Sequence, residues 1–224
     1  RSMSDSNQAT PSTTASTVSP SVEPEGQEMA ANVSIVPGDR AFFATGCFWG
    51  AERRFWSLPG VLTTTVGYMG GTKSEPTYKE VCTGTTGHAE VVEVVFDPSR
   101  ITYFDLLEEF WTMHDPTSLN QQGGDIGTQY RSAIYTTSPE QMIEAVNTRD
   151  AYEAVLLENG MEKICTEIQD ADGMRFWLAE DYHQRYLEKN PNGYDCHSST
   201  GIAFPRYKVQ RELQETTTTT RSEK

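Results

Sequence analysis

The order of the predicted elements places the chain in the α+β class, as a two-layer sandwich with helices packed on a mixed sheet. Apolar or β-branched runs and segments of helical period follow one another as β-α-β-β-α-β. This is the order of the split β-α-β, or ferredoxin-like, arrangement. A further helix and strand follow, and then a long irregular C-terminal segment. At 224 residues, the chain is long enough for one domain with a proper core.

The first four core elements are predicted from residue type and spacing. Residues 41–44 are an apolar run typical of a short buried strand, and residues 51–56 have the pattern of a helix. Residues 61–68 are rich in β-branched side chains, and residues 90–96 alternate and are dense in valine. Both are therefore predicted strands, and the stretch between them is predicted to be a loop.

The second half begins with a helix that Thr102 caps and that ends at His114. A polar loop at residues 117–129 follows, and a loop of this length inside a domain is more often functional than idle. The remaining predicted elements are a strand at 131–135, a helix from a capping box at Ser138 to Asn159, a strand at 163–169 and a helix at 179–187. Beyond a turn, Cys196 lies in irregular chain.

Composition and charge restrict the partners of the protein. The formal charge of −14 and the pI near 4.7 argue against nucleic acid and against anionic membrane surfaces. No apolar stretch approaches the length of a membrane span. The four cysteines are far apart and form no C-x-x-C pattern, which is typical neither of a disulfide framework nor of a zinc site. We therefore expect a cytoplasmic protein that holds no metal and does not associate with membranes.

Both ends of the chain are predicted to be disordered tails. Residues 1–37 are rich in Ser, Thr, Pro, Ala, Gln and Glu, and residues 212–224 contain a run of threonines. The first tail has neither the apolar stretch of a secretory signal nor the arginines of a mitochondrial presequence. Residues 38–211 are then the folded domain, and we expect it to be a monomer.

Cys47 lies where the first strand turns into the first helix, within Gly46-Cys47-Phe48-Trp49-Gly50. Unpaired N–H groups and the helix dipole stabilise an anion there, so we expect a lowered pKa for the Cys47 thiol. Gly46 leaves one side of the sulfur uncovered, and Phe48 and Trp49 can form an apolar wall beside it. The alternative is a small buried residue at a strand end. The glycines, the helix start and the aromatic pair favour a reactive thiol.

Five polar side chains lie at predicted strand ends or in loops: Tyr78, His88, Glu90, Asp125 and Tyr130. Glu90 lies at the head of a valine-rich strand, where burial would raise the pKa of its carboxyl and allow it to act as a general acid. The alternative, that Glu90 is simply an exposed residue at a strand end, is equally compatible with the sequence. The two tyrosines could donate hydrogen bonds to a ligand oxygen, or could be core residues with the hydroxyl at the surface. Asp125 could equally be an ordinary turn aspartate.

The other histidines and cysteines are interpreted as structural. His114 lies on the apolar face of a helix and ends it, which favours capping over catalysis. His88 could bond a backbone group or position the carboxyl two residues later, and His183 is interpreted as structural. Cys82 and Cys165 have apolar neighbours, so we expect inert thiols in fixed, buried positions.

Four segments, in the same order along the chain, resemble the signature blocks of the A-type methionine sulfoxide reductases. They are Gly46-Cys47-Phe48-Trp49-Gly50, residues 77–90, residues 114–132 and residues 179–184. The similarity extends from about residue 41 to Cys196. It implies an enzyme that reduces the S epimer of methionine sulfoxide, free or in proteins, and so repairs oxidised proteins.

The resemblance also implies roles for the candidate residues. Cys47 is the nucleophile, and Glu90 gives a proton to the sulfoxide oxygen, which leaves a sulfenic acid on Cys47. It implies five substrate-binding residues. Phe48 and Trp49 hold the methyl group of the substrate, Tyr78 and Tyr130 hydrogen-bond its oxygen, and Asp125 helps to order the site.

Recycling of the thiol is a further implication of the resemblance. Many family members carry two recycling cysteines near the C-terminus, but here Cys196 alone follows the late helix. We therefore expect a direct Cys47–Cys196 disulfide, which the family implies is reduced by thioredoxin. No metal or organic cofactor is implied.

Two other functions remain open on sequence alone. A thiol peroxidase would also form a sulfenic acid at Cys47, and a non-catalytic adaptor could bind oxidised methionine without turnover. The aromatic pair and Glu90 fit a methyl sulfoxide better than a small peroxide.

Overall fold

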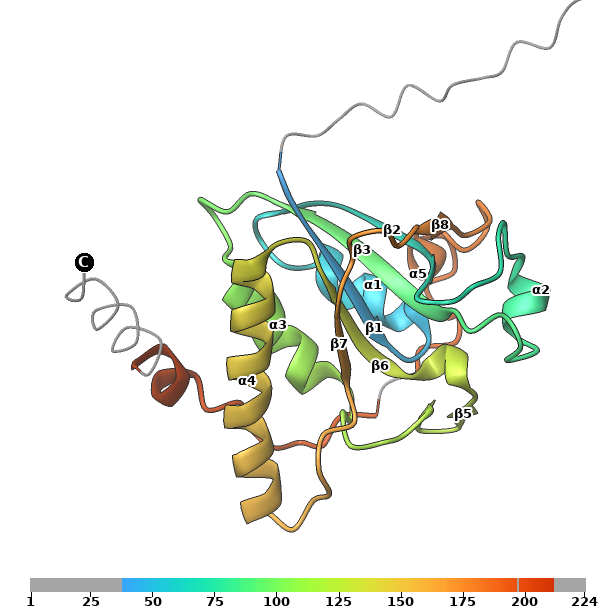
Figure 1. Cartoon of the computed structure of the whole chain (residues 1–224). Helices are drawn as coiled ribbons and strands as arrows, with labels where there is room; N and C mark the ends of the chain where they lie inside the picture. Colours follow the sequence, from blue (N-terminus) through green and yellow to red (C-terminus); the bar gives the residue numbers. More distant parts are fainter. Residues whose placement is uncertain (1–37, 197, 212–224) are drawn as a thin grey trace, which may run out of the picture. The chain divides into compact units, whose positions relative to one another are not determined.

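A six-stranded sheet is the frame of the computed structural model, which describes residues 38–196 and 198–211 (Figure 1). The predicted tails, residues 1–37 and 212–224, lie outside the described residues. The strands of this sheet are β1 Asp39–Thr45, β2 Val61–Met69, β3 Ala89–Phe96, β6 Ser132–Thr136, β7 Glu167–Asp170 and β8 Trp177–Leu178. The helices are α1 Phe48–Trp56, α2 Tyr78–Val81, α3 Tyr103–Met113, α4 Pro139–Glu158 and α5 Tyr186–Lys189, with a 3-10 turn at Thr128–Tyr130. A separate small hairpin pairs β4 Gln121–Gln122 with β5 Asp125–Ile126.

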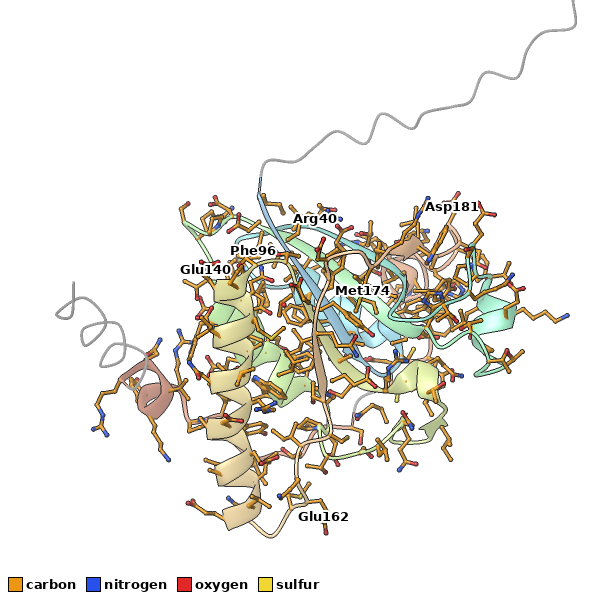
Figure 2. The ribbon with its side chains drawn as sticks, viewed as in Figure 1. Arg40, Phe96, Glu140, Glu162, Met174 and Asp181 are labelled. Carbon is orange, nitrogen blue, oxygen red and sulfur yellow. The ribbon has the colours of Figure 1, made fainter. Side chains whose placement is uncertain are left out.

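The central strands have the ferredoxin-like topology that the element order predicts. The sheet order is β7-β6-β1-β3-β2-β8, and the four inner strands pair with one another in antiparallel fashion. Arg40 and Phe96 lie at one end of the β1–β3 pair (Figure 2). At its edge, β7 pairs with β6 in parallel, which makes the sheet mixed. The predicted α+β class is therefore confirmed.

Helices α1 and α3 form the main core against one face of the sheet. Phe43, in the central strand β1, stacks on Phe55 of α1 with ring centroids 5.0 Å apart. Its ring also lies 5.4 Å from that of Phe110 on α3. Helix α4 packs on α3, where Trp111 donates a hydrogen bond of 2.9 Å to the hydroxyl of Thr148. This packing fixes α1, and with it the position of Cys47 at its start.

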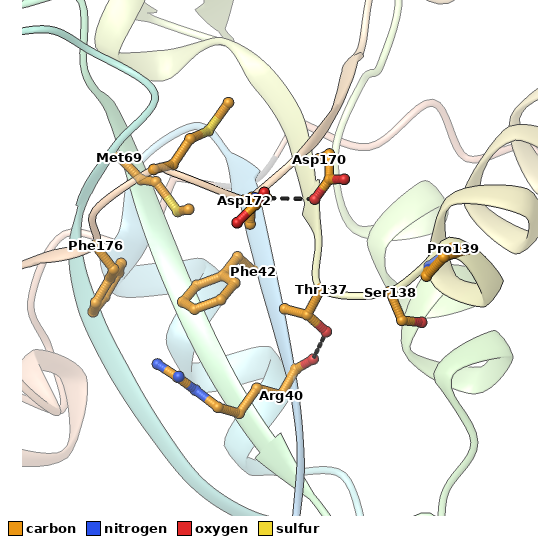
Figure 3. Close-up of a pocket in the computed structure, with 11 residues that line it drawn as sticks. Arg40, Phe42, Met69, Thr137, Ser138, Pro139, Asp170, Asp172 and Phe176 are labelled. Atoms are coloured by element: carbon orange, nitrogen blue, oxygen red, sulfur yellow. Dashed lines mark hydrogen bonds between the residues drawn. The ribbon is translucent and has the colours of Figure 1, made fainter.

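The opposite face of the sheet is covered by irregular chain. Phe42 and Met69 form a second apolar cluster with Met174 and Phe176, and the rings of Phe42 and Phe176 lie 5.4 Å apart. A cavity of about 500 Å³ lies at this cluster (Figure 3). Among the described residues, no helix combines the length and the apolar character that a membrane span needs.

The predicted helix at residues 179–187 is wrong for most of its length. Residues 181–185 form turns, and a helix begins at Tyr186. The physical reason is that side chains from other elements bind this backbone. The buried carboxylate of Glu52 accepts a hydrogen bond of 2.9 Å from the N–H of Arg185, which has a positive φ of 52°. The side-chain amide of Gln184 bonds both backbone groups of Val66 and also donates to the carbonyl oxygen of Ala179.

Five short elements also differ from the sequence expectation. The predicted loop between β2 and β3 contains α2, where Thr77 and Glu80 form a capping box. The hairpin of β4 and β5 lies inside the predicted loop at residues 117–129, and β8 adds a strand at the sheet edge. The predicted strand at 163–169 is shorter and begins at Glu167. Elements of two to four residues are too short to show a period in the sequence.

Candidate active site

A cavity of about 190 Å³ gathers the residues predicted to act on a substrate. It lies at the start of α1, the head of β3, α2 and the β4–β5 hairpin. The residues that line it are Cys47, Phe48, Trp49, Tyr78, Glu90, Asp125, Tyr130 and Tyr194. Seven of them were predicted from the sequence; Tyr194 was not. The remaining predicted residue, Cys196, lies close by but does not line the cavity.

Cys47 is the N-cap residue of α1 and is 8% exposed. The chain reaches it through Gly46, whose φ is +102°. A Cβ atom at Gly46 would lie 2.7 Å from side-chain carbons of Gln122, so a larger residue would have to displace that side chain. Glycine thus lets the strand turn into the helix next to the β4–β5 hairpin.

The expected lowering of the Cys47 pKa is wrong for the empty site. Burial raises the pKa of the thiol, and the negative charge of Glu90 raises it further. A hydrogen bond from the N–H of Trp49 acts in the opposite direction, as the helix N-terminus predicts, but it is the smaller effect. The thiol is therefore protonated before a substrate enters.

Glu90 is 2% exposed, which rules out the alternative of an exposed strand-end residue. Burial raises the pKa of its carboxyl to about 8, and a nearby negative charge on Asp125 contributes in the same direction. The N–H of Phe48, at the start of α1, donates a 3.0 Å hydrogen bond to Oε2 and opposes this rise. Near neutral pH the carboxyl keeps its proton, so it can act as a general acid. Its negative charge raises the pKa of Cys47 only once the carboxyl ionises.

The aromatic wall of the cavity is held in place by His183, which the sequence did not assign to the site. The indole Nε1–H of Trp49 donates a 3.0 Å hydrogen bond to Nδ1 of His183. The ring of Phe48 lies 5.1 Å from the same imidazole, and Trp49 stacks on Tyr186 at 3.8 Å. His183 is fully buried. These contacts fix both aromatic rings beside the sulfur.

Tyr78 is oriented from two sides. Its N–H donates a 2.8 Å hydrogen bond to Oε1 of Glu180, and its ring lies 4.4 Å from that of His183. Oε2 of Glu180 accepts a bond of 2.8 Å from the hydroxyl of Tyr68. Burial raises the pKa values of Tyr78 and Tyr130, so both hydroxyls remain protonated donors over the physiological range.

Asp125 links the cavity to the C-terminal segment. Its Oδ1 accepts a 3.1 Å hydrogen bond from the hydroxyl of Tyr194. The sulfur of Cys196 lies 3.6 Å from the carbonyl oxygen of Gln122, three residues before Asp125. A charge on Cys196 acts on the pKa of Cys47, so the two sulfurs lie within electrostatic reach of each other.

The histidines outside the cavity make backbone and core contacts. Nδ1 of His88 accepts a 3.0 Å hydrogen bond from the N–H of Gly71, and Nε2 lies 2.8 Å from the carbonyl oxygen of Lys73. His88 therefore holds the loop after β2. Both nitrogens of buried His114 are engaged within 2.7 Å, by the carbonyl of Phe110 and by a serine hydroxyl. This agrees with a structural role for His114.

The two remaining thiols differ from each other. The expectation of a buried position is wrong for Cys82. It is the C-cap residue of α2, a surface helix of four residues, and its side chain is exposed. Cys165 is partly buried, and its sulfur donates to the carbonyl oxygen of Pro116 at 3.2 Å. Among the described residues, no group of three or more His, Cys, Asp or Glu side chains is arranged to hold a metal ion.

Comparison with known proteins decides the family. The family model of peptide methionine sulfoxide reductase matches residues 39–216. The chain belongs to this family. It is 55% identical over 172 residues to the peptide methionine sulfoxide reductase MsrA of Methylococcus capsulatus, covering 77% of each chain. It is 56% identical over 167 residues to that of Pseudomonas entomophila, covering 75% of this chain and 74% of the relative.

Solved structures of the family have the same fold. Methionine sulfoxide reductase A of Corynebacterium diphtheriae superposes with a TM-score of 0.69 at 46% identity, over 75% of this chain and 82% of that one. Reduced Mxr1 of Saccharomyces cerevisiae gives a TM-score of 0.64 at 37% identity, over 72% and 91%.

The cavity at Cys47 and the larger cavity on the far face of the sheet differ in chemistry. The larger cavity is lined by Arg40, Phe42, Met69 and neighbouring residues on the far face of the sheet (Figure 3). None of the described residues that line it is a cysteine. The smaller cavity contains Cys47 and Glu90, so it is the candidate site for thiol chemistry.

Proposed function

We propose that the chain reduces the S epimer of methionine sulfoxide, free or in proteins, to methionine, with Cys47 as the nucleophile. The observation that supports this most directly is that Cys47 and Glu90 line one small cavity with an aromatic wall. A methyl sulfoxide combines an apolar methyl group with a strongly accepting oxygen. The rings of Phe48 and Trp49 suit the methyl group, and the protonated carboxyl suits the oxygen.

The first step needs activation of the sulfoxide oxygen. A sulfoxide sulfur is a poor electrophile until its oxygen is protonated or strongly hydrogen-bonded. Tyr78 and Tyr130 donate hydrogen bonds to this oxygen, and Glu90 gives it a proton as the sulfur of Cys47 attacks. The bond between the methionine sulfur and the oxygen breaks and leaves its electron pair on the methionine sulfur, while the oxygen forms a new bond to the sulfur of Cys47. Methionine departs, and Cys47 carries a sulfenic acid.

Glu90 also accounts for the proton of the Cys47 thiol. The thiol is protonated in the empty site because of burial and the nearby carboxyl. When Glu90 transfers its proton to the sulfoxide oxygen, it becomes a base that can accept the thiol proton. The pKa of about 8 allows Glu90 to give and receive a proton near neutral pH. In sum, the thiol proton moves to the oxygen and no ion is left behind.

Recycling completes the proposed cycle. The thiol of Cys196 attacks the sulfenic acid on Cys47 and forms a disulfide, which thioredoxin reduces. This is supported by the position of Cys196 within electrostatic reach of Cys47. The four cysteines are widely spaced and have no C-x-x-C pattern, which is unlike the disulfide frameworks of secreted proteins. We place the activity in the cytoplasm on that basis.

Turnover of the two methionine sulfoxide epimers tests this proposal, with thioredoxin and with dithiothreitol as alternative reductants. We expect wild type to reduce the S epimer with both reductants and Cys47→Ser to reduce it with neither. Cys165→Ser, on a thiol that does not line the cavity, is the matched control and should retain the wild-type rate. Turnover of hydrogen peroxide but not of sulfoxide would instead indicate a thiol peroxidase. Binding of sulfoxide without turnover would indicate an adaptor.

A further inference from the structure

We infer that Asp125 is the general base of the second step, in which the thiol of Cys196 attacks the sulfenic acid on Cys47. We further infer that Tyr194 positions this base. The inference rests on the proposed function, because that function supplies the sulfenic acid. It gives Asp125 a role that begins after the substrate has reacted.

The geometry places one carboxylate beside both partners of the step. Asp125 lines the same cavity as Cys47. The side chain of Cys196 lies within hydrogen-bonding reach of the Asp125 carboxylate. Oδ1 of Asp125 accepts the 3.1 Å hydrogen bond from Tyr194. Oδ2 is shut off from solvent and accepts no hydrogen bond from any described residue. A buried oxygen with this free capacity is a ready proton acceptor.

Three consecutive residues dock the C-terminal segment at this place. The hydroxyl of Tyr194 bonds Asp125, and Asp195 forms an ion pair with Arg53 on α1. The sulfur of Cys196 lies 3.6 Å from the carbonyl oxygen of Gln122. The contacts reach both sides of the cavity, the helix α1 and the β4–β5 hairpin. The thiol is therefore held near the carboxylate before the sulfenic acid forms.

The Cys196 thiol needs a base because it is a poor nucleophile when protonated. Burial and the neighbouring Asp125 carboxylate together raise the pKa of Cys196 to about 11. At pH 7 only about one molecule in ten thousand would carry the thiolate. The carboxylate that holds the proton on the resting thiol can accept it as the new bond forms. General-base assistance of this kind typically contributes about two to four orders of magnitude in rate.

The step balances without any outside oxidant. The electron pair of the Cys196 sulfur forms the S–S bond, while the S–O bond of the sulfenic acid breaks and leaves its pair on oxygen. Asp125 accepts the thiol proton and passes it to the leaving oxygen, which departs as water. The sulfur of Cys196 is oxidised, the sulfenic sulfur of Cys47 is reduced, and Asp125 is again a carboxylate.

Single-turnover kinetics without a reductant separate the two steps. Wild type, Asp125→Asn and Asp125→Glu are mixed with methionine S-sulfoxide. The methionine released reports the first step, in which the Cys47 thiol is lost, and the loss of a second thiol, that of Cys196, reports the second step. We expect Asp125→Asn to lose this second thiol at least about tenfold more slowly than wild type, and Asp125→Glu to recover part of the rate. In Asp125→Asn the second step should also accelerate about tenfold per pH unit, because hydroxide must then remove the proton.

Two further measurements exclude simpler explanations. In the first, one equivalent of hydrogen peroxide forms the sulfenic acid on Cys47 in place of the sulfoxide. The rate of the second step then no longer depends on how the substrate binds next to Asp125. Tyr194→Phe should slow thiol loss several-fold, while Asp150→Asn, on the exposed face of α4, should leave both steps unchanged.

The outcomes distinguish this inference from the function on which it rests. Thiol loss in Asp125→Asn that is as fast as in wild type, or faster, would overturn the inference. The carboxylate would then act only as a charge that holds the proton on Cys196. The proposed function would survive that result as long as wild type releases methionine. If wild type releases no methionine, both the proposed function and the inference about Asp125 are wrong.

Discussion

Glu90 differs strongly in its surroundings between the folded and the unfolded chain. In the folded protein its carboxyl keeps its proton up to about pH 8 because it is buried, whereas the unfolded chain loses it near its ordinary pKa of 4.5. Between these values the folded state binds more protons, so stability must fall as the pH rises. The upper bound on this loss is about 5 kcal/mol.

We therefore expect Glu90→Gln to be more stable than wild type at pH 9 and to lose most of this advantage at pH 4. Urea unfolding of both proteins at these pH values measures it. Glu52, whose pKa burial raises to about 7, contributes the same trend in both proteins and cancels in the comparison. Equal pH dependence in the two proteins would mean that Glu90 is ionised in the fold.

His183 should act on substrate binding rather than on the chemical step. His183→Phe leaves the indole N–H of Trp49 without its acceptor, which costs about 1–3 kcal/mol when the donor is buried. We expect an increase of about tenfold in KM for the sulfoxide with a much smaller change in the single-turnover rate. Tyr207→Phe, at an exposed position, is the control. A lower rate at unchanged KM would place His183 in the chemistry.

Residue chemistry was predicted from the sequence where neighbours along the chain determine it. The place of Cys47 at a helix start was visible in the glycines and aromatic residues beside it. The raised pKa of Cys47 was not predicted. It depends on burial in the folded protein and on the charge of Glu90, which lies in a strand 43 residues further along the sequence. Tyr194 and His183 reach the site from still more distant segments, and no local pattern marks them.

At the scale of elements, the segment between β8 and α5 depends on Glu52 of α1. The carboxylate accepts hydrogen bonds from the hydroxyl of Thr64 and from the N–H of Arg185, and it is fully buried. This bond holds the turn that places His183 behind the aromatic wall. The segment's shape is thus set by a side chain of another element.

Glu52→Ala should loosen this segment and lower the free energy of unfolding by about 2–3 kcal/mol, because it leaves a buried N–H and hydroxyl unpaired. Hydrogen exchange of residues 179–189 should become faster, more than elsewhere in the protein. Glu188→Ala removes an exposed ion pair with Arg185 in the same segment and should leave both the stability and the exchange of this segment nearly unchanged. Uniform acceleration of exchange across the domain would show that Glu52 supports the core instead.

The longer elements were predictable because each has a period of its own. Strands β1, β2, β3 and β6 and helices α1, α3 and α4 all correspond to predicted segments. The elements that were missed, α2, β4, β5 and β8, have two to four residues. Their structure comes from a capping box or from a neighbouring strand, which a periodic pattern cannot reveal.

For the whole molecule, the element order was sufficient to predict the ferredoxin-like core, because chain order and the antiparallel pairing of neighbours leave few topologies. The edge strands β7 and β8 depend on long-range contacts and were less predictable. The predicted tails were assigned from composition alone.

A chain shortened to residues 38–211 tests the proposed domain limits. We expect its kcat/KM and its midpoint of thermal unfolding to equal those of the full chain, because the composition of the removed segments cannot bury enough apolar surface to fold. Kinetics with the free amino acid sulfoxide and calorimetry measure the two quantities. A clear loss in either would show that a removed segment packs on the domain.

The most direct test of the account is a single turnover of Cys196→Ser with the S epimer of methionine sulfoxide, without a reductant. The account predicts one equivalent of methionine per protein and a sulfenic acid on Cys47, which dimedone traps and peptide mapping locates. Dithiothreitol should then restore turnover, and thioredoxin should not, because no disulfide can form. Release of no methionine, or a dimedone adduct on Cys82 or Cys165 instead of Cys47, would contradict the account.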